Sequence, residues 1–270
     1  MRRFGLIGVV LALAACGGDE RDSRTVVAAF YPLAWASERI AEGRYEVVNL
    51  TPAGAEPHDI ELSPHDVEVI VDAELVVYAG SGFQQAVEDA VTDRDGPSLD
   101  ILHGDRDPHV WLDPVRFADV VRDIGEALDR SAAAEDLAGE ISRLDESYRR
   151  GLDDCARRVL VTTHAAFGRL AARYGLEQLS LTGSSPEAEP GPRELERLVD
   201  DVRASGATTV FAEPLVSDRL ASTVAREAGL EVAVLDPLEG LSEARLEAGE
   251  DYLSVMRGNL ASLRNALGCR

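Results

Sequence analysis

Histidine is scarce in this chain, and three of its five histidines lie in short segments that also carry proline or glycine. His58 ends the segment EPH, His109 lies in PHVWLDP, and His164 lies in TTHAAFG. A fourth segment, LDPL, carries Asp236. Three imidazoles and one carboxylate form a closed tetrahedral set of ligands for Zn²⁺. Because the four segments are spread over most of the chain, the sequence predicts a metal site that only the whole fold can assemble.

The carboxylate of this site has several candidates. Asp236 precedes a proline, and Asp-Pro also occurs in ordinary turns. Glu213, in the segment FAEP, is an alternative ligand or a residue that orients one. Glu56, two residues before His58, is another alternative ligand, and a water molecule is a further one. The residues alone therefore leave the fourth ligand open.

Three other polar residues in or near these segments have ordinary interpretations. Asp113 precedes Pro114 and is predicted to cap the helix that this proline begins. His65 and His103 lie in polar surroundings and are predicted to be exposed to solvent. These residues are therefore left out of the predicted metal site.

Apolar runs typical of buried strands alternate with helical patterns along both halves of the chain. Such alternation is typical of parallel sheets covered by helices, so the predicted fold class is α/β. Three candidate ligands end or follow strands that are predicted at residues 45–50, 159–163 and 231–235. His109 comes from the loop after a fourth strand, at 98–102. Since open α/β sheets bind ligands beyond the carboxyl ends of their strands, this placement supports a binding role.

A long helix is predicted between the two halves, over residues 133–155, and another closes the chain at 246–267. In the first of these, apolar residues recur at steps of three and four and form one stripe: Leu137, Ile141, Leu144, Tyr148 and Leu152. Its centre contains neither glycine nor proline, so the helix is expected to be rigid and roughly 30 Å long. The predicted organisation is an N-terminal α/β lobe at 25–131, an interlobe helix at 132–156 and a C-terminal α/β lobe at 157–270.

The first residues are typical of an export signal with a lipid attachment site. Two arginines precede an apolar run that is too short to cross a bilayer as a helix, and the run ends in LAAC. This ending looks like a bacterial lipobox. The prediction is a signal peptide at 1–15, a lipid-modified Cys16 and a polar tether at 16–24. The protein would then be extracytoplasmic and anchored to the cell membrane.

Charge and cysteine content narrow the choice of partners and of covalent links. The formal net charge of −22 argues against nucleic acid as a partner. With Cys16 assigned to the lipid anchor, Cys155 and Cys269 are the two cysteines left. In an exported protein these two are predicted to form a disulfide, which would tie the C-terminus to the start of the second lobe.

The EPH, PHVWLDP and THAAFG segments, in this order, resemble those of the ZnuA- and TroA-like substrate-binding lipoproteins of bacterial zinc and manganese ABC importers. The resemblance extends from the lipobox over essentially the whole chain. It implies two lobes joined by a rigid helix, with the metal in the cleft and two ligands from each lobe. The first lobe would supply His58 and His109. The second lobe would supply His164 and Asp236.

The function that the resemblance implies is high-affinity capture of Zn²⁺ outside the cytoplasm by a monomeric protein that delivers the ion to a membrane permease. Manganese-binding relatives usually have a carboxylate at the position of His164. Three imidazoles and one carboxylate suit Zn²⁺ better than Mn²⁺. Many zinc-binding relatives carry a histidine-rich acidic loop before the second ligand, whereas this chain has only HGDRD at 103–107. Zinc is therefore the expected cargo, without accessory capture by such a loop.

Three other functions are the alternatives. The first is a protein of the same class that binds Mn²⁺ or another divalent metal. The second is a zinc hydrolase, because three histidines and a water molecule would leave a position for catalysis. The sequence, however, has no His-Glu-x-x-His helix, Gly-x-Ser-x-Gly turn or glycine-rich phosphate loop, so the chain is not expected to be an enzyme. The third is a surface adhesin.

Overall fold

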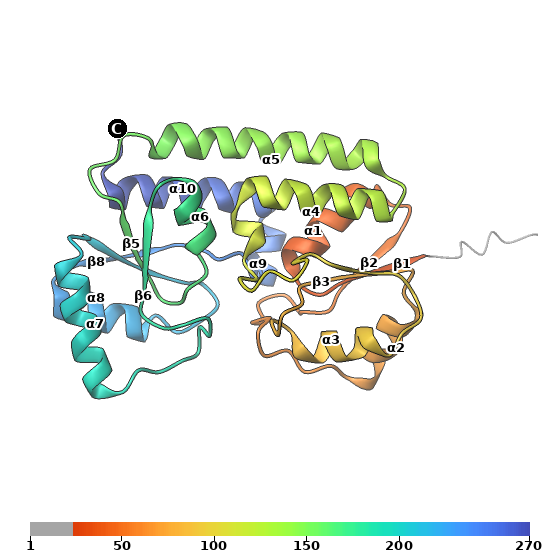
Figure 1. Cartoon of the computed structure of the whole chain (residues 1–270), viewed down its shortest axis with the longest axis horizontal. Helices are drawn as coiled ribbons and strands as arrows, with labels where there is room; N and C mark the ends of the chain where they lie inside the picture. The colour runs from red at the N-terminus through yellow and green to blue at the C-terminus, as the bar shows by residue number, and fades with distance from the viewer. Residues whose placement is uncertain (1–23) are drawn as a thin grey trace, which may run out of the picture.

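Two parallel four-stranded sheets, one in each half of the chain, form the frame of the molecule (Figure 1). The computed structural model describes residues 24–270, so the predicted signal peptide, Cys16 and all of the tether except its last residue lie outside the described residues. The strands are β1 (Thr25–Ala28), β2 (Glu46–Asn49), β3 (Leu75–Tyr78), β4 (Ser98–Asp100), β5 (Val159–Thr162), β6 (Glu177–Ser180), β7 (Thr209–Ala212) and β8 (Glu231–Val234). The sheet orders are β2-β1-β3-β4 and β6-β5-β7-β8. The predicted α/β fold with two parallel-sheet lobes is confirmed.

The strand order reverses beside the first strand of each sheet, β1 in the first lobe and β5 in the second. In the first sheet, Val27 of β1 lies between Val48 of β2 and Val76 of β3, and all strand pairs are parallel. The first strand of each lobe therefore lies inside its sheet, and the chain builds first to one side and then to the other. Such a reversal leaves a crevice beyond the carboxyl ends of the two central strands. Each lobe thus offers one natural place for ligand-binding loops.

Helices cover both faces of the sheets (Figure 1). They are α1 (Tyr31–Ala41), α2 (Pro64–Asp72), α3 (Gln85–Thr92), the 3₁₀ turn η1 (Val110–Leu112), α4 (Pro114–Ala127), α5 (Ser131–Leu152), α6 (Gly168–Arg173), α7 (Pro192–Ala204), α8 (Arg219–Ala228), α9 (Glu243–Glu247) and α10 (Tyr252–Leu267). At the start of α4, the Asp113 side chain accepts hydrogen bonds from the backbone N–H groups of Val115 and Arg116. The predicted helix cap at Asp113 is therefore confirmed.

The long helix α5 runs along both lobes on one side of the molecule (Figure 1). Its predicted apolar stripe is buried, and the helix packs against α4 and α10. The Tyr148 hydroxyl of α5 donates a hydrogen bond to the Met256 carbonyl of α10 at 2.7 Å. With 22 residues, α5 is about 33 Å long. The exact lobe boundaries stay a prediction, whereas one helix does extend over both lobes (Figure 1).

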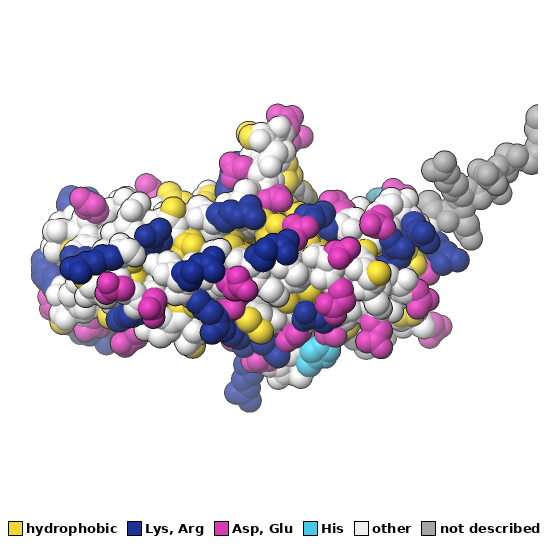
Figure 2. Space-filling view, turned by 90° about the horizontal axis from the view of Figure 1, so that it is seen from above, with side chains coloured by type: hydrophobic (Ala, Val, Ile, Leu, Met, Phe, Trp, Pro, Cys, Tyr) yellow, Lys and Arg dark blue, Asp and Glu magenta, His cyan; other side chains and the backbone are white. Residues whose placement is uncertain are grey.

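The surface above α5 mixes arginine and acidic side chains (Figure 2). Acidic side chains lie among and beside the arginines on this face, so it does not form the continuous basic surface that nucleic-acid binding uses. Among residues 24–270, none of the helices combines the length and apolar character needed to cross a membrane.

The end of the chain forms two helices instead of the single helix expected at 246–267. α9 ends at Glu247, and α10 begins at Tyr252. Between them Gly249 adopts a φ of +78°, and Asp251 accepts a hydrogen bond from the Ser254 N–H at 2.7 Å. A left-handed glycine ends a helix and a capping aspartate starts one, so these local signals prevail over the helical spacing of the apolar residues.

The predicted disulfide between Cys155 and Cys269 is confirmed. It joins the segment that follows α5 to the segment that follows α10. Nearby, the Arg157 N–H donates to the Leu267 carbonyl at 3.0 Å. The C-terminal ends of α5 and α10 are thereby tied together.

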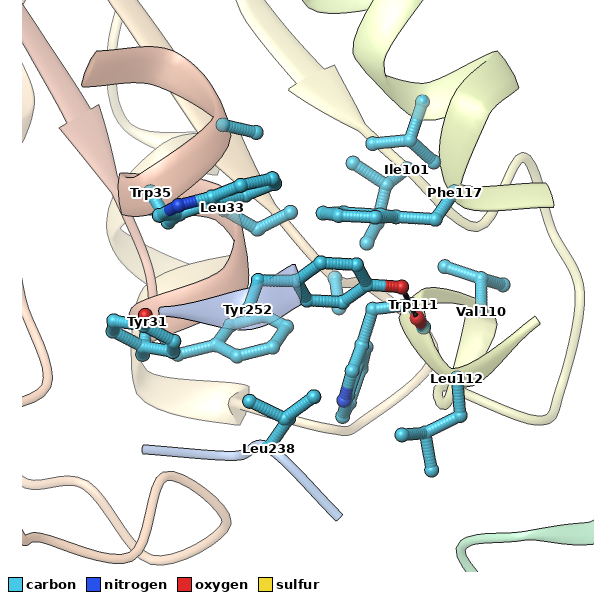
Figure 3. Packing of buried hydrophobic residues seen from close by; sticks show 14 of the residues in the cluster. Tyr31, Leu33, Trp35, Ile101, Val110, Trp111, Leu112, Phe117, Leu238 and Tyr252 are labelled. Atoms are coloured by element: carbon cyan, nitrogen blue, oxygen red, sulfur yellow. Dashed lines mark hydrogen bonds between the residues drawn. The ribbon is translucent and has the colours of Figure 1, made fainter. Parts of the chain in front are cut away.

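Aromatic residues fill the boundary between the two lobes (Figure 3). Tyr252 packs against both Trp35 and Phe117 of the first lobe, with ring centroids 5.0 and 4.6 Å away. The Tyr252 hydroxyl donates to the Trp111 carbonyl at 2.6 Å, and the Trp111 indole N–H donates to the Pro237 carbonyl at 2.7 Å. The loop that follows β8 is therefore held directly by the core of the first lobe.

Candidate metal centre

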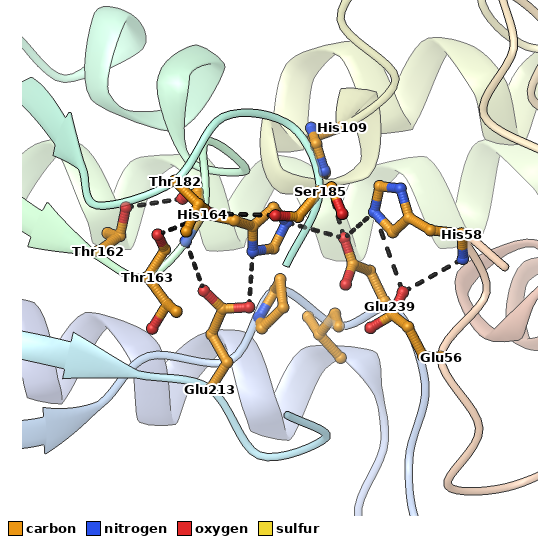
Figure 4. Close-up of polar contacts among 12 residues, drawn as sticks. Glu56, His58, His109, Thr162, Thr163, His164, Thr182, Ser185, Glu213 and Glu239 are labelled. Atoms are coloured by element: carbon orange, nitrogen blue, oxygen red, sulfur yellow. Dashed lines mark hydrogen bonds and ion pairs between the residues drawn. The ribbon is translucent and has the colours of Figure 1, made fainter. Parts of the chain in front are cut away.

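The three predicted histidines converge on one buried carboxylate between the lobes (Figure 4). Oε1 of Glu239 lies 3.1 Å from Nε2 of His58 and 3.2 Å from Nε2 of both His109 and His164. A tetrahedral metal site with metal–ligand distances of about 2.0 Å has ligand–ligand edges of about 3.3 Å. The four ligand atoms, which all lie within 4.8 Å of one another, therefore have the spacing of a small tetrahedral site.

The carboxylate in this cluster is Glu239, and this finding corrects the expectation that Asp236 would occupy the position. Oδ2 of Asp236 instead lies 2.6 Å from the Arg245 guanidinium, and its Oδ1 accepts the Leu238 N–H at 2.7 Å. The Asn259 amide binds both backbone groups of Asp236, at 2.9 and 2.7 Å. Asp236 is thus engaged in holding the loop after β8, and the loop turns Glu239 into the cleft.

Each member of the cluster comes from a loop at the carboxyl end of a strand. His58 lies in the loop after β2, His109 directly precedes η1, His164 is the second residue after β5, and Glu239 follows β8. Two members therefore belong to the first lobe and two to the second. This placement agrees with the general position of ligand sites in open α/β sheets.

Burial leaves two atoms of this cluster without hydrogen-bond partners. The side chains of His109, His164 and Glu239 are at most 1% exposed, whereas His58 is 14% exposed. Nε2 of His109 makes no hydrogen bond even though it lies 3.2 Å from Oε1 of Glu239, and Oε2 of Glu239 makes none either within the described part of the chain. Buried polar atoms nearly always have a partner. A cation bound among the four side chains would supply one.

The outer nitrogen atoms of two histidines are held by carboxylates. Nδ1 of His164 lies 2.6 Å from Oε2 of Glu213, and Nδ1 of His109 lies 2.9 Å from Oδ1 of Asp107. A carboxylate on Nδ1 places the ring proton there and leaves the lone pair of Nε2 free for a metal. Glu213 therefore orients a predicted ligand rather than joining the cluster. The role of Asp107 was missed in the sequence, although its position two residues before His109 is a usable signal.

Glu56, the other alternative carboxylate, also lies beside the cluster without joining it. Its Oε1 accepts the backbone N–H of His58 at 3.2 Å and is 4.0 Å from Nε2 of the same residue. His65 and His103, which were predicted to be exposed, have side chains 81% and 58% exposed. They lie outside the cluster, as expected.

The cluster is strongly polarised. Burial alone would lower the pKa of His164, but hydrogen bonds to Glu213 and Glu239 raise it to about 10. Burial alone would raise the pKa of Glu239, but the three imidazoles hold it well below its usual range. Burial, together with the nearby Glu239, raises the pKa of Glu56 to about 8. Without a metal, protons on the imidazoles therefore balance the buried carboxylate, and a metal cation would have to replace them.

The arrangement suits binding better than catalysis. Four protein side chains close the tetrahedron, whereas a catalytic zinc site keeps a position for water or substrate. Because His58 and His109 lie in one lobe and His164 and Glu239 in the other, an ion bound here would cross-link the lobes.

Comparisons with known proteins point in the same direction. The family described as zinc-uptake complex component A, periplasmic (ZnuA), matches residues 26–266. The zinc-binding protein AdcA of Streptococcus pyogenes serotype M1 is 33% identical over 283 residues, which cover 88% of this chain and 55% of AdcA. The chain thus spans about half the length of the curated relatives it matches.

Solved structures match over most of the described chain. The laminin-binding protein of Streptococcus agalactiae, described as an adhesin with metal transporting activity, has a TM-score of 0.82 and 30% identity, covering 91% of this chain and 100% of that one. The Zn(II)-bound ZnuA-like domain of Streptococcus pneumoniae AdcA has a TM-score of 0.78 and 33% identity, covering 91% and 99%. Since the family match extends over residues 26–266, this chain belongs to the ZnuA family of periplasmic zinc-uptake components.

Proposed function

We propose that this protein captures Zn²⁺ outside the cytoplasm and delivers it to the permease of an ABC importer. The main observation behind the proposal is that three imidazoles and one carboxylate converge, with their ligand atoms spaced as in a tetrahedral zinc site. In this proposal the ligands are His58, His109, His164 and Glu239. Membership of the ZnuA family and the zinc-binding names of the relatives support it.

Zinc is the proposed cargo because of the donor set. Three imidazoles and a single carboxylate make a nitrogen-rich, four-coordinate site. Mn²⁺ favours oxygen ligands and six-coordinate geometry, so it is the weaker candidate. The carboxylates that would be needed for a harder site, Glu213 and Glu56, are instead bound to the outer nitrogen of His164 and to the backbone of His58.

Capture and release would follow from limited movement of the lobes. The stiff helix α5 and the aromatic packing around Tyr252 restrict wide opening. His58 is the most exposed member of the cluster, so the ion is proposed to enter and leave on its side. Docking on the permease would separate the ligands of one lobe from those of the other. No catalytic step is part of this proposal.

Membrane attachment is proposed from the N-terminal sequence. The LAAC ending of the apolar run supports lipid modification of Cys16, which would hold a monomeric protein at the outer side of the cell membrane. Mass spectrometry of the protein purified from membranes tests this step. A mature N-terminus without a lipid-modified Cys16 would rule out the anchor and leave the metal site unaffected.

Competition titration with a zinc chelator tests the main proposal. We expect one Zn²⁺ per metal-free chain, and strong weakening by alanine at His58, His109 or His164. Alanine at His65 or His103, both exposed, provides matched controls that should keep the parental affinity. Failure of the parent to bind one equivalent of zinc, or tighter binding of Mn²⁺ than of Zn²⁺ at the same pH, would refute the assignment.

A further inference from the structure

Two arginines of α6 connect the second lobe to the first. Nη2 of Arg169 lies 2.7 Å from Oδ2 of Asp105, and its Nε lies 3.2 Å from Oδ2 of Asp107. One turn later, Arg173 forms an ion pair with Asp113, the cap of α4. The arginine side chains are 17% and 22% exposed, so both ion pairs are only partly open to solvent.

Of these two arginines, only Arg169 binds the carboxylate that orients a proposed metal ligand. Its Nη2 also donates to the backbone carbonyl of Asp107 at 2.8 Å. The other oxygen of Asp107, Oδ1, accepts the backbone N–H of His109 at 3.1 Å and contacts Nδ1 of the ring at 2.9 Å. A continuous set of contacts therefore runs from α6 of the second lobe to an imidazole of the first.

The segment that carries Asp107 needs such a support. His103 and Gly104 both adopt left-handed conformations, with φ of +49° and +84°. Asp107 itself is 36% exposed. A guanidinium group presents several donors in a rigid fork, which suits two carboxylates and a carbonyl at once. Arg169 thus fixes a carboxylate that would otherwise lie on a solvated loop.

We propose that Arg169 is a positioning residue: when the lobes are closed, it fixes the orientation in which His109 can bind the metal. This inference rests on the proposed zinc-binding function. When α6 is in place, Arg169 holds Asp107, and Asp107 holds the proton on Nδ1 so that Nε2 faces the cleft. When the second lobe moves away, it withdraws its own ligands and at the same moment frees Asp107 and the ring of His109. Both lobes therefore loosen the ion together.

The contacts between the lobes differ in kind on the α10 side and on the α6 side of the boundary, and this difference bears on which side opens first. On the side of α10 the contacts are neutral and buried, as between the Trp111 indole and the Pro237 carbonyl at 2.7 Å. On the side of α6 they include the ion pairs of Arg169 with Asp105 and Asp107, whose side chains are 40% and 36% exposed. Salt screens exposed charges more than buried neutral contacts. The α6 side is thus the one that parts first, and zinc release from the parent should become faster as salt concentration rises.

Stopped-flow mixing of zinc-loaded protein with excess chelator measures this release. We expect Arg169→Gln to release zinc about 10–100-fold faster, the range for losing a group that supports a ligand from outside. Arg169→Lys should recover part of this loss, since it restores the charge without the fork. Arg173→Gln is the matched control, because it removes a neighbouring interlobe ion pair that does not contact Asp107. It should accelerate release clearly less than Arg169→Gln does.

A double variant and a spectrum separate positioning from general loosening. Asp107→Asn keeps an oxygen for Nδ1 of His109 but removes the charge that binds Arg169. Adding Arg169→Gln to Asp107→Asn should then accelerate release much less than Arg169→Gln does in the parent, because only the contacts of Arg169 with Asp105 and with the Asp107 carbonyl remain to be lost. In ¹⁵N-edited NMR spectra of the zinc-loaded protein, the Nδ1–H signal of His109 should exchange faster with water in Arg169→Gln than in the parent or in Arg173→Gln.

The outcomes distinguish this inference from the proposed function. A parental release rate in Arg169→Gln, equal acceleration in Arg173→Gln, or an additive double variant would each overturn the positioning role. A parent protein that binds no zinc would instead overturn the proposed function. Faster release in Arg169→Gln than in Arg173→Gln, together with faster Nδ1–H exchange in Arg169→Gln alone, would establish the positioning role.

Discussion

At the scale of single residues, each of two imidazoles in the cluster is held between two carboxylates. His164 lies between Glu213 on Nδ1 and Glu239 on Nε2, at 2.6 and 3.2 Å. His109 lies between Asp107 and Glu239 in the same way, at 2.9 and 3.2 Å. In the proposed site the outer carboxylate would fix the proton and the ring direction, and the inner one would bind the ion. Glu213, Asp107 and Glu239 thus carry the same functional group, and their different positions around the imidazoles give them different proposed roles.

The first prediction separates Glu239 from Asp236. Glu239→Ala should weaken zinc binding by more than the 10–100-fold typical of an outer partner, because it removes the carboxylate at the centre of the cluster. Asp236→Asn should weaken it by no more than that range, because Asp236 acts only through the loop and its partner Arg245. Competition titration of both variants measures the difference. The reverse order would restore Asp236 as the ligand.

The second prediction concerns pH. Zinc needs neutral imidazoles, and in the metal-free protein Glu213 and Glu239 raise the pKa of His164 to about 10 despite its burial. At neutral pH this ring therefore keeps its proton, and zinc must displace it. Affinity should rise with pH, by up to about tenfold per unit for each proton displaced, until the pH passes the raised pKa. Glu213→Gln removes one cause of the raised pKa and should flatten this dependence.

Calorimetry in buffers with different ionisation enthalpies checks the second prediction, because it counts the protons that zinc binding releases. We expect net release at pH 7 in the parent and less release in Glu213→Gln. Glu189→Gln, on an exposed side chain of the second lobe, is a suitable control and should match the parent. Binding without proton release at pH 7 would contradict the expectation.

The three histidines of the site could be predicted from the sequence, because the signals that single them out lie in their own short segments. His58, His109 and His164 stand out because histidine is scarce and each follows a strand. Glu239 was not among the candidates for the carboxylate, and its place in the cluster could not be predicted in this way. That place depends on Arg245 and Asn259, 9 and 23 residues after Asp236 in the chain, which engage Asp236 and leave Glu239 free. It is set by tertiary packing.

At the scale of elements, the loop after β8 contains a strained backbone conformation close to the site. Leu238 is buried and adopts a left-handed φ of +57°, which is strained for a residue with a side chain. Asn259 of α10 holds this loop by accepting the Asp236 N–H at 2.9 Å and donating to the Asp236 carbonyl at 2.7 Å. The position of Glu239 therefore depends on a side chain from a different element.

The third prediction follows from this support. Asn259→Ala leaves two buried backbone groups of Asp236 without these partners, so it should lower the free energy of unfolding by about 1–3 kcal/mol. It should also weaken zinc binding, because Glu239 is no longer fixed. Urea unfolding of the metal-free protein and chelator competition measure the two effects. Asn265→Ala, on an exposed position of the same helix, should change neither. Parental zinc affinity in Asn259→Ala would show that the loop holds its shape unaided.

Elements could be predicted from the sequence wherever one pattern is uninterrupted. The stripe from Leu137 to Leu152 and the alternation of strands and helices gave α5 and both sheets. The division of the last helix could not be read from apolar spacing. It follows from the left-handed Gly249 and the cap at Asp251, which override that spacing.

At the scale of the whole molecule, the two lobes are joined in two different ways. On one side α5 runs along both lobes (Figure 1), and the disulfide between Cys155 and Cys269 ties the segment after α5 to the segment after α10. Between the lobes, the four side chains of the candidate metal site meet without any covalent link. The first connection keeps the lobes together at all times. The second would exist only while an ion is bound, and it would therefore stabilise the closed arrangement alone.

The last prediction separates these two connections. Cys155→Ser/Cys269→Ser should lower the free energy of unfolding by about 2–4 kcal/mol, because a long loop of the unfolded chain is no longer closed. Zinc affinity should stay within about threefold of the parental value, since Asn259 and Tyr252 still hold the loop of Glu239 through α10. Urea unfolding with and without zinc tests both parts, and the increment of stability due to zinc should be equal in parent and variant. A smaller zinc increment in the variant would mean that the disulfide, by fixing α10 to α5, also sets the position of the metal ligands.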